Sequence, residues 1–137
     1  MKTLVLYYSY TGHAKTRAQA FAEKESADIA EIKEVKRAGK FKAYTAGCFA
    51  VLRGKAWPIQ SLDADLTAYG RLILVSPVWA GNPPPFMYAV LAQLPEGKTV
   101  SVQMVSASGT SNCKDRVEAA IKAKGCTLES FEDFKNK

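Results

Sequence analysis

The residues best suited to chemistry in this chain follow its first apolar segment. The run Thr3–Tyr8 leads directly into Ser-Tyr-Thr-Gly-His-Ala-Lys-Thr at positions 9–16, which predicts a strand, a hydroxyl-rich turn and a helix start. The N–H groups in the first turn of a helix lack internal partners, and the helix dipole favours negative charge there. Gly12 lets a ligand approach the backbone closely, and the Ser9 and Thr11 hydroxyls add donors. We therefore predict a phosphate site here.

A second candidate site follows the third apolar segment, in the sequence Ser-Pro-Val-Trp-Ala-Gly-Asn-Pro-Pro-Pro at positions 76–85. Trp79 offers a flat aromatic face, Gly81 allows close approach, and the prolines stiffen the loop. The small residues at positions 107–112 follow the next segment, and their backbone can reach the edge of a planar ligand. The predicted ligand is a phosphorylated aromatic cofactor, bound by Ser9, Tyr10, Thr11, Gly12, His13, Ala14, Lys15, Thr16, Pro77, Val78, Trp79, Ala80, Gly81, Asn82, Ser108 and Gly109.

These loops must be positioned by alternating strands and helices. The alternation predicts an α/β domain with a parallel sheet covered by helices on both faces. Ligands bind such sheets beyond the carboxyl ends of strands where the chain order reverses, so the loops after the first, third and fourth strands are expected to meet. The predicted strands are 3–8, 29–35, 71–76, 99–105 and 126–131, the predicted helices are 15–24, 43–53, 84–94 and 114–124, and residues 1–137 are expected to form one domain.

The predicted strands differ in how apolar they are. Residues 4–7 and 72–75 are apolar at consecutive positions, as strands covered on both faces must be. Residues 99–105 and 126–131 alternate between apolar and polar, which predicts strands covered on one face only. Only six residues follow Phe131, too few for a further helix. We therefore expect the last helix of the sandwich to be absent and one face of the last two strands to lack its cover.

Composition limits the environment in which the chain works. Its 137 residues are 47% hydrophobic, which suits one domain with a normal core. No segment is long and apolar enough to span a membrane, and the chain begins with a strand rather than a signal peptide. The three cysteines are scattered and lack metal-ligand spacing. They suit free thiols in the cytoplasm.

The positive charge of the chain is concentrated in one segment. Residues 33–55 hold seven Lys and Arg side chains and one Glu, which equals the net charge of +6 of the whole chain. This segment is either a solvated basic loop or a docking surface for an acidic redox partner or a phosphorylated substrate such as NADPH. Nucleic acid is not expected as a partner, because no interleaved aromatics or known binding module accompany the charge.

The two loops resemble those of the flavodoxin family. Ser9, Thr11 and Gly12 match the family's phosphate-loop pattern Ser/Thr-x-Thr-Gly-x-Thr, and residues 76–81 and 62–69 are similar to its flavin loop and the segment before it. The resemblance extends over residues 3–125. It implies a flavodoxin-like three-layer sandwich with a five-stranded parallel sheet in the order 2-1-3-4-5, non-covalently bound FMN and electron transfer.

The chain departs from the family pattern in three ways. Ala14 stands where the last Thr of the phosphate loop is expected, although its N–H remains and Thr16 offers a nearby hydroxyl. Residues 106–112 contain no aromatic to stack on the flavin. The chain is also basic, whereas flavodoxins are typically acidic.

Several alternatives remain open at the level of sequence. The chain is an electron carrier for a partner protein, a small FMN-dependent NAD(P)H oxidoreductase of the quinone-reductase type, or a cofactor-free binding module, and we expect a monomer or weak dimer. The turn at 9–12 could serve only as a helix cap, and Trp79 could pack in the core rather than against a flavin. His13 is expected to lend its backbone N–H rather than its ring, and no catalytic residue is assigned.

Overall fold

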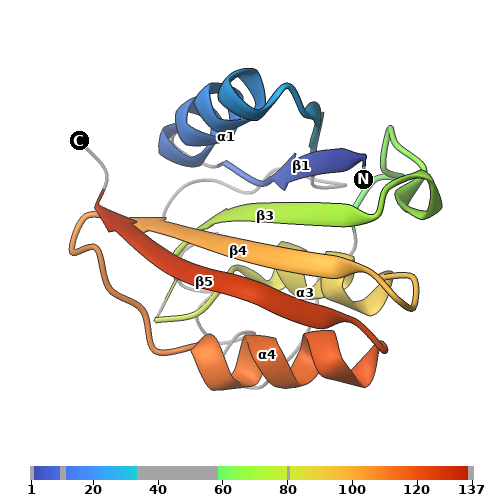
Figure 1. Cartoon of the computed structure of the whole chain (residues 1–137). Coiled ribbons are helices and arrows are strands. Elements are labelled where there is room, and N and C mark those ends of the chain that lie inside the picture. Colours follow the sequence, from blue (N-terminus) through green and yellow to red (C-terminus); the bar gives the residue numbers. More distant parts are fainter. Residues whose placement is uncertain (1, 10–11, 34–58, 80, 136–137) are drawn as a thin grey trace.

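The sheet of this protein has five parallel strands in the order β2-β1-β3-β4-β5 (Figure 1). The structure is a computed structural model that describes residues 2–9, 12–33, 59–79 and 81–135. The strands are β1 (Thr3–Tyr7), β2 (Asp28–Glu31), β3 (Arg71–Pro77), β4 (Thr99–Ser106) and β5 (Thr127–Lys135). The helices among the described residues are α1 (His13–Glu25), α3 (Pro85–Ala92), α4 (Lys114–Ala123) and the short 3₁₀ helix η1 (Leu66–Ala68).

The described helices cover the two faces of the sheet (Figure 1), with α1 on one face and α3 and α4 on the other. The predicted α/β class, the parallel sheet and the strand order 2-1-3-4-5 are therefore confirmed. The chain order reverses between β1 and β3, because β2 pairs with one edge of β1 and β3 pairs with the other. The loops at this switch point carry the candidate site.

Most element boundaries agree with the sequence pattern to within two residues. The second strand is shorter than predicted and ends at Glu31, although the Ile32 N–H still donates to the Tyr7 carbonyl at 2.7 Å. The last strand is longer than predicted and continues past Phe131 to Lys135. The predicted helix 43–53 and residues 34–35 of the second strand lie outside the described residues.

The core consists of two layers that follow the alternation of side chains along the strands. One face of the sheet contributes Leu4, Leu6 and Leu74 to a cluster with α3 and α4. The opposite face contributes Val5, Ile73 and other residues to a cluster with Ala14, Ala18 and Ala22 of α1. Because these three helix positions are alanines, the α1 backbone packs close to the sheet, and this fixes the position of the helix start beside the end of β1.

The prediction that β4 is covered on one face only is wrong. Ser101 and Gln103, its polar positions on the α1 face, are 3% and 5% exposed. On this face Ser101 contacts Glu129 of β5, and Val105 packs in the cluster with α1. For β5 the prediction is confirmed in part: Leu128 and Phe131 pack against the α3 and α4 core, whereas on the α1 face Glu129 is exposed but Phe134 is half-buried against Arg17.

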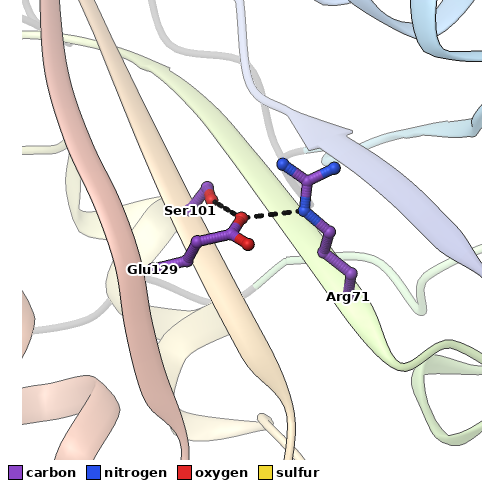
Figure 2. Close-up of polar contacts among 3 residues, drawn as sticks. All are labelled: Arg71, Ser101 and Glu129. Atoms are coloured by element: carbon purple, nitrogen blue, oxygen red, sulfur yellow. Dashed lines mark hydrogen bonds and ion pairs between the residues drawn. The ribbon is translucent and has the colours of Figure 1, made fainter. Parts of the chain in front are cut away.

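A β-bulge in β5 makes this polar cover possible. The register opposes Val100 to Leu128 and Ser101 to Ser130, so Glu129 is the extra residue, and a bulge re-aims the side chain that it carries. One Glu129 oxygen, Oε1, accepts hydrogen bonds from Ser101 Oγ at 2.7 Å and from Arg71 Nε at 2.8 Å (Figure 2). The three side chains link β3, β4 and β5 across the α1 face of the sheet.

This cluster predicts a small, pH-dependent contribution to stability. The Ser101 hydroxyl and then the Arg71 guanidinium hold the pKa of Glu129 below its ordinary value of 4.5. A lowered folded-state pKa stabilises the protein above pH 4.5, and this stabilisation is lost as the pH falls through the folded-state pKa. Because Glu129 is 42% exposed, we expect Glu129→Gln to cost less than about 1 kcal/mol at pH 7.

Urea unfolding at pH 7 and at about pH 3 tests this expectation. The difference between Glu129→Gln and the wild type should shrink at the lower pH, because the unfolded-state carboxylate, with its ordinary pKa of 4.5, is then protonated and part of the stabilisation is lost. Glu132→Gln on the same strand is the matched control, since it removes an equal charge without breaking either hydrogen bond. A Glu129→Gln effect of the same size at both pH values would contradict the assigned role of the carboxylate.

None of the helices in the described part of the chain combines the length and apolar character needed to cross a membrane.

Candidate functional site

The turn between β1 and α1 has the geometry of an open anion site. Gly12 is the N-cap of α1 with φ +103° and ψ −13°, a conformation that side chains with a Cβ rarely adopt. A Cβ placed on Gly12 would meet no heavy atom within 4 Å among the described residues. The Gly12 N–H donates to Ser9 Oγ at 2.8 Å, which holds the Ser9 side chain at the start of α1. Tyr10 and Thr11 lie outside the described residues.

Among the described residues, no side chain caps the N–H groups in the first turn of α1, and the turn carries no acidic residue. His13 and Lys15 are exposed, and the helix is thirteen residues long. A helix of this length with an uncapped start favours a bound negative charge.

Thr16 does not replace the hydroxyl that Ala14 lacks. Its Oγ1 donates back to the Gly12 carbonyl at 3.0 Å and so holds the turn in place. Ala14 is 2% exposed and its methyl group packs against the sheet with Val5 and Ile73. A Thr at this position would place a hydroxyl in that apolar layer, which explains why Ala is suitable here.

The loop after β3 is a tight turn that places Trp79 in the core. Trp79 and Asn82 form an antiparallel bridge through hydrogen bonds of 2.7 and 3.0 Å, and Gly81 has φ +78°. The indole is 6% exposed and meets the rings of Tyr8 and Phe86 edge-on, with centroids 6.2 and 6.3 Å away. This placement supports the packing role for Trp79, and contact with a ligand stays a prediction. Ala80 lies outside the described residues.

The loops after β3 and β4 meet and enclose a pocket, as the sheet topology predicts. The Asn112 N–H donates to the Gly81 carbonyl at 2.8 Å. A Cβ on Gly81 would lie 3.1 Å from Asn112 Nδ2 and would be strained at φ +78°, so Gly suits this position. The pocket has a volume of about 400 Å³ and is lined by Val78, Gly81, Ser106, Ala107, Ser108, Thr110, Ser111 and Asn112.

Hydroxyl groups hold the backbone of the loop after β4. Ser106 Oγ accepts from the Gly109 N–H at 3.0 Å, and Ser108 Oγ accepts from the Thr110 N–H at 3.3 Å. Gly109 has φ +76°. These bonds give a loop of small residues a defined shape without aromatic packing, so its polar edge is available to a planar ligand.

Charged and reactive side chains lie beside the pocket rather than in its lining. Arg116 of α4 donates from Nη1 to Asn82 Oδ1 at 3.3 Å. Cys113 is buried, and burial raises the pKa of its thiol, so the thiol stays protonated and unreactive at neutral pH. Within residues 2–9, 12–33, 59–79 and 81–135, no group of His, Cys, Asp and Glu could hold a metal ion.

The structure brings most of the described predicted site residues to the carboxyl edge of the sheet. Gly12, His13, Lys15 and Thr16 lie at the start of α1, and Val78, Gly81 and Ser108 line the pocket. Pro77 ends β3 and Asn82 closes the turn behind the pocket. The prediction missed four lining residues in the small-residue loop that it had identified (Ala107, Thr110, Ser111 and Asn112) and one at the end of β4 (Ser106).

Comparison with known proteins identifies the fold. No family model and no curated protein sequence matches the chain. Among solved structures, a flavoprotein from Lactobacillus acidophilus in complex with FMN is similar with a TM-score of 0.77 and 23% identity, covering 98% of this chain and 93% of that chain. A putative flavoprotein from Bacteroides eggerthii gives 0.81 and 17%, covering 99% and 89%. The two-electron reduced Megasphaera elsdenii flavodoxin gives 0.62 and 13%, covering 98% and 86%. The chain therefore has a flavodoxin-like fold.

Proposed function

We propose that this chain binds FMN non-covalently at the carboxyl edge of its sheet and acts as an electron carrier. The observation that carries the proposal is the juxtaposition of two unlike half-sites on one edge. The uncapped α1 start at Gly12 suits a phosphate, and the pocket between the loops after β3 and β4 suits a planar ring. One of the similar solved structures is a complex with FMN.

The residues present fit this cofactor. The open space over Gly12 accepts a phosphate where any other residue would place a Cβ. The pocket volume of about 400 Å³ lies in the range of small-molecule sites. Val78 supplies an apolar contact, and the backbone of the loop after β4 supplies polar groups for the ring edge. Bound FMN would supply reversible one- and two-electron transfer, and the protein would bind, orient and shield it.

The pocket lining favours a carrier over an oxidoreductase. The lining side chains that the structure describes are aliphatic, hydroxyl or amide groups, and none of them is a general acid or base at neutral pH. An oxidoreductase that reduces a carbonyl or quinone commonly needs a group to place a proton on its substrate. A carrier needs only an accessible ring edge and a partner.

We propose an acidic protein as the redox partner, working with the chain in the cytoplasm. The net charge of +6 lies in residues 33–55, of which 34–55 are outside the described residues. The described residues on either side of 34–58 meet at the carboxyl edge of β2, where the Gln60 N–H donates to the Lys33 carbonyl at 2.8 Å. A basic segment near the cofactor edge would attract an acidic partner. NAD(P)H is the alternative, through its phosphates.

The visible spectrum of the purified protein tests the proposal. After incubation with FMN and gel filtration, we expect a flavin band with one FMN per chain. Dithionite should bleach the band, and NADPH alone should leave it unchanged over minutes. Protein that leaves the column without flavin would contradict FMN binding, whereas rapid bleaching by NADPH would support the oxidoreductase instead of the carrier.

A further inference from the structure

The end of β5, the edge strand next to β4, contacts an element of each half of the candidate site. β5 continues to Lys135, four residues beyond the end at Phe131 that the sequence pattern predicts. Its last pairings with β4 join Val105 to Phe134 and Ser106 to Lys135. The strand therefore ends at the edge of the sheet where α1 begins and where the loop after β4 leaves (Figure 1).

Phe134 contacts the phosphate half through α1. The guanidinium carbon of Arg17 lies 3.6 Å from the centre of the Phe134 ring. Arg17 is one turn after the start of α1 at His13. Both side chains are half-buried, and stacking of a guanidinium on an aromatic face at this distance is attractive. The contact fixes the first turns of α1 relative to the last strand.

Lys135 contacts the ring half through the loop after β4. A Cβ placed on Gly109 would lie 3.3 Å from the Cβ of Lys135 and 3.5 Å from its Cα and N. The loop backbone therefore packs directly on the backbone of β5 at this point. Phe134 and Lys135 are adjacent in the chain, so one short rigid segment touches both half-sites.

We propose that the end of β5 sets the separation between the phosphate half and the ring half of the FMN site, with Phe134 as a positioning residue that acts through Arg17. This inference rests on the proposed function. It assigns a role to the four residues by which β5 exceeds its predicted length.

Two-point binding gives this proposal a distinctive consequence. FMN occupies both half-sites at once, so its affinity depends on how well their separation matches the ligand. Riboflavin lacks the phosphate and uses only the ring half, and inorganic phosphate uses only the other half. A change in the separation should therefore weaken FMN binding while leaving riboflavin and phosphate binding almost unchanged.

The test measures the dissociation constants of FMN and riboflavin for the full chain by flavin fluorescence. We expect Phe134→Leu, which keeps an apolar side chain but removes the ring, to weaken FMN binding by about tenfold, or about 1.4 kcal/mol. Riboflavin affinity should change less than about twofold. Arg17→Gln should reproduce this result, and the double variant should be no weaker than either single variant because the two residues act through one contact.

Two further variants keep the test specific. Phe134→Tyr retains the ring and should bind FMN like the wild type. Phe131→Leu is the matched control, because Phe131 lies on the same strand but packs against the α3 and α4 core. Unchanged FMN affinity in folded Phe134→Leu, or an equal loss for FMN and riboflavin, would overturn the inference. Failure of the wild type itself to bind FMN would instead overturn the proposed function.

Discussion

Replacing Gly12 with Ala is expected to lower the affinity for FMN by at least about 100-fold, or about 2.8 kcal/mol. The new Cβ would project into the open space where the phosphate is proposed to bind. The residue would also resist φ +103°, so the turn would shift and the N–H groups of the first helical turn would lose their alignment. Titration of the folded variant with FMN measures the loss.

Gly97→Ala provides the control for backbone strain. Gly97 also has a positive φ, +84°, and a Cβ there would likewise meet no described atom within 4 Å. It lies in the turn before β4, at the opposite edge of the sheet from the candidate site. Both variants should lose comparable stability, but only Gly12→Ala should lose FMN. Equal FMN affinity in the two variants would contradict the phosphate assignment.

Replacing Ile73 with Ala is expected to lower the free energy of unfolding by about 2–5 kcal/mol. Ile73 is fully buried in the middle of β3, beneath the alanine face of α1. The helix backbone packs closely there, so the cavity left by the lost methyl groups cannot be filled without moving α1. Urea unfolding monitored by circular dichroism measures the change.

Ile29→Ala is the matched control for Ile73→Ala, because it makes the same substitution at a strand position where the side chain is exposed. Ile29 of β2 is 41% exposed, and its truncation should cost less than about 1 kcal/mol because it removes little buried surface. A similar cost at the two positions would mean that α1 does not cover the sheet as described. Ile73→Ala should also weaken FMN binding, because a displaced α1 carries the phosphate half with it.

The fold could be predicted from the sequence because its main signal is local. Consecutive apolar residues at 4–7 and 72–75 can only be satisfied in strands covered on both faces, and the helical segments between them require a parallel arrangement. The burial of β4 could not be predicted in the same way. Ser101 on its α1 face contacts Glu129, which Arg71 also holds, and that contact depends on a bulge and on residues far apart in the chain.

The candidate site was predictable in outline for a similar reason. Gly12 and Gly81 stand where a turn needs a positive φ, and such positions can be recognised in the sequence. The burial of Trp79 could not be predicted from the sequence, because a Trp after a strand can either contact a ligand or pack in the core. The contact of Phe134 with Arg17 could not be predicted either. The charged residues after Phe131 do not resemble a strand in the sequence, and pairing with β4 extends β5 to Lys135.

The measurement that tests the central claim most directly is an amide chemical-shift titration of the isotope-labelled protein with FMN and with riboflavin. The account predicts that FMN shifts two groups of amides, one at Gly12, His13 and Ala14 and one in the loop at 106–112. Riboflavin should shift the loop and leave the α1 start unchanged. Shifts elsewhere on the molecule, or shifts at the α1 start with riboflavin as large as those with FMN, would contradict the proposed site.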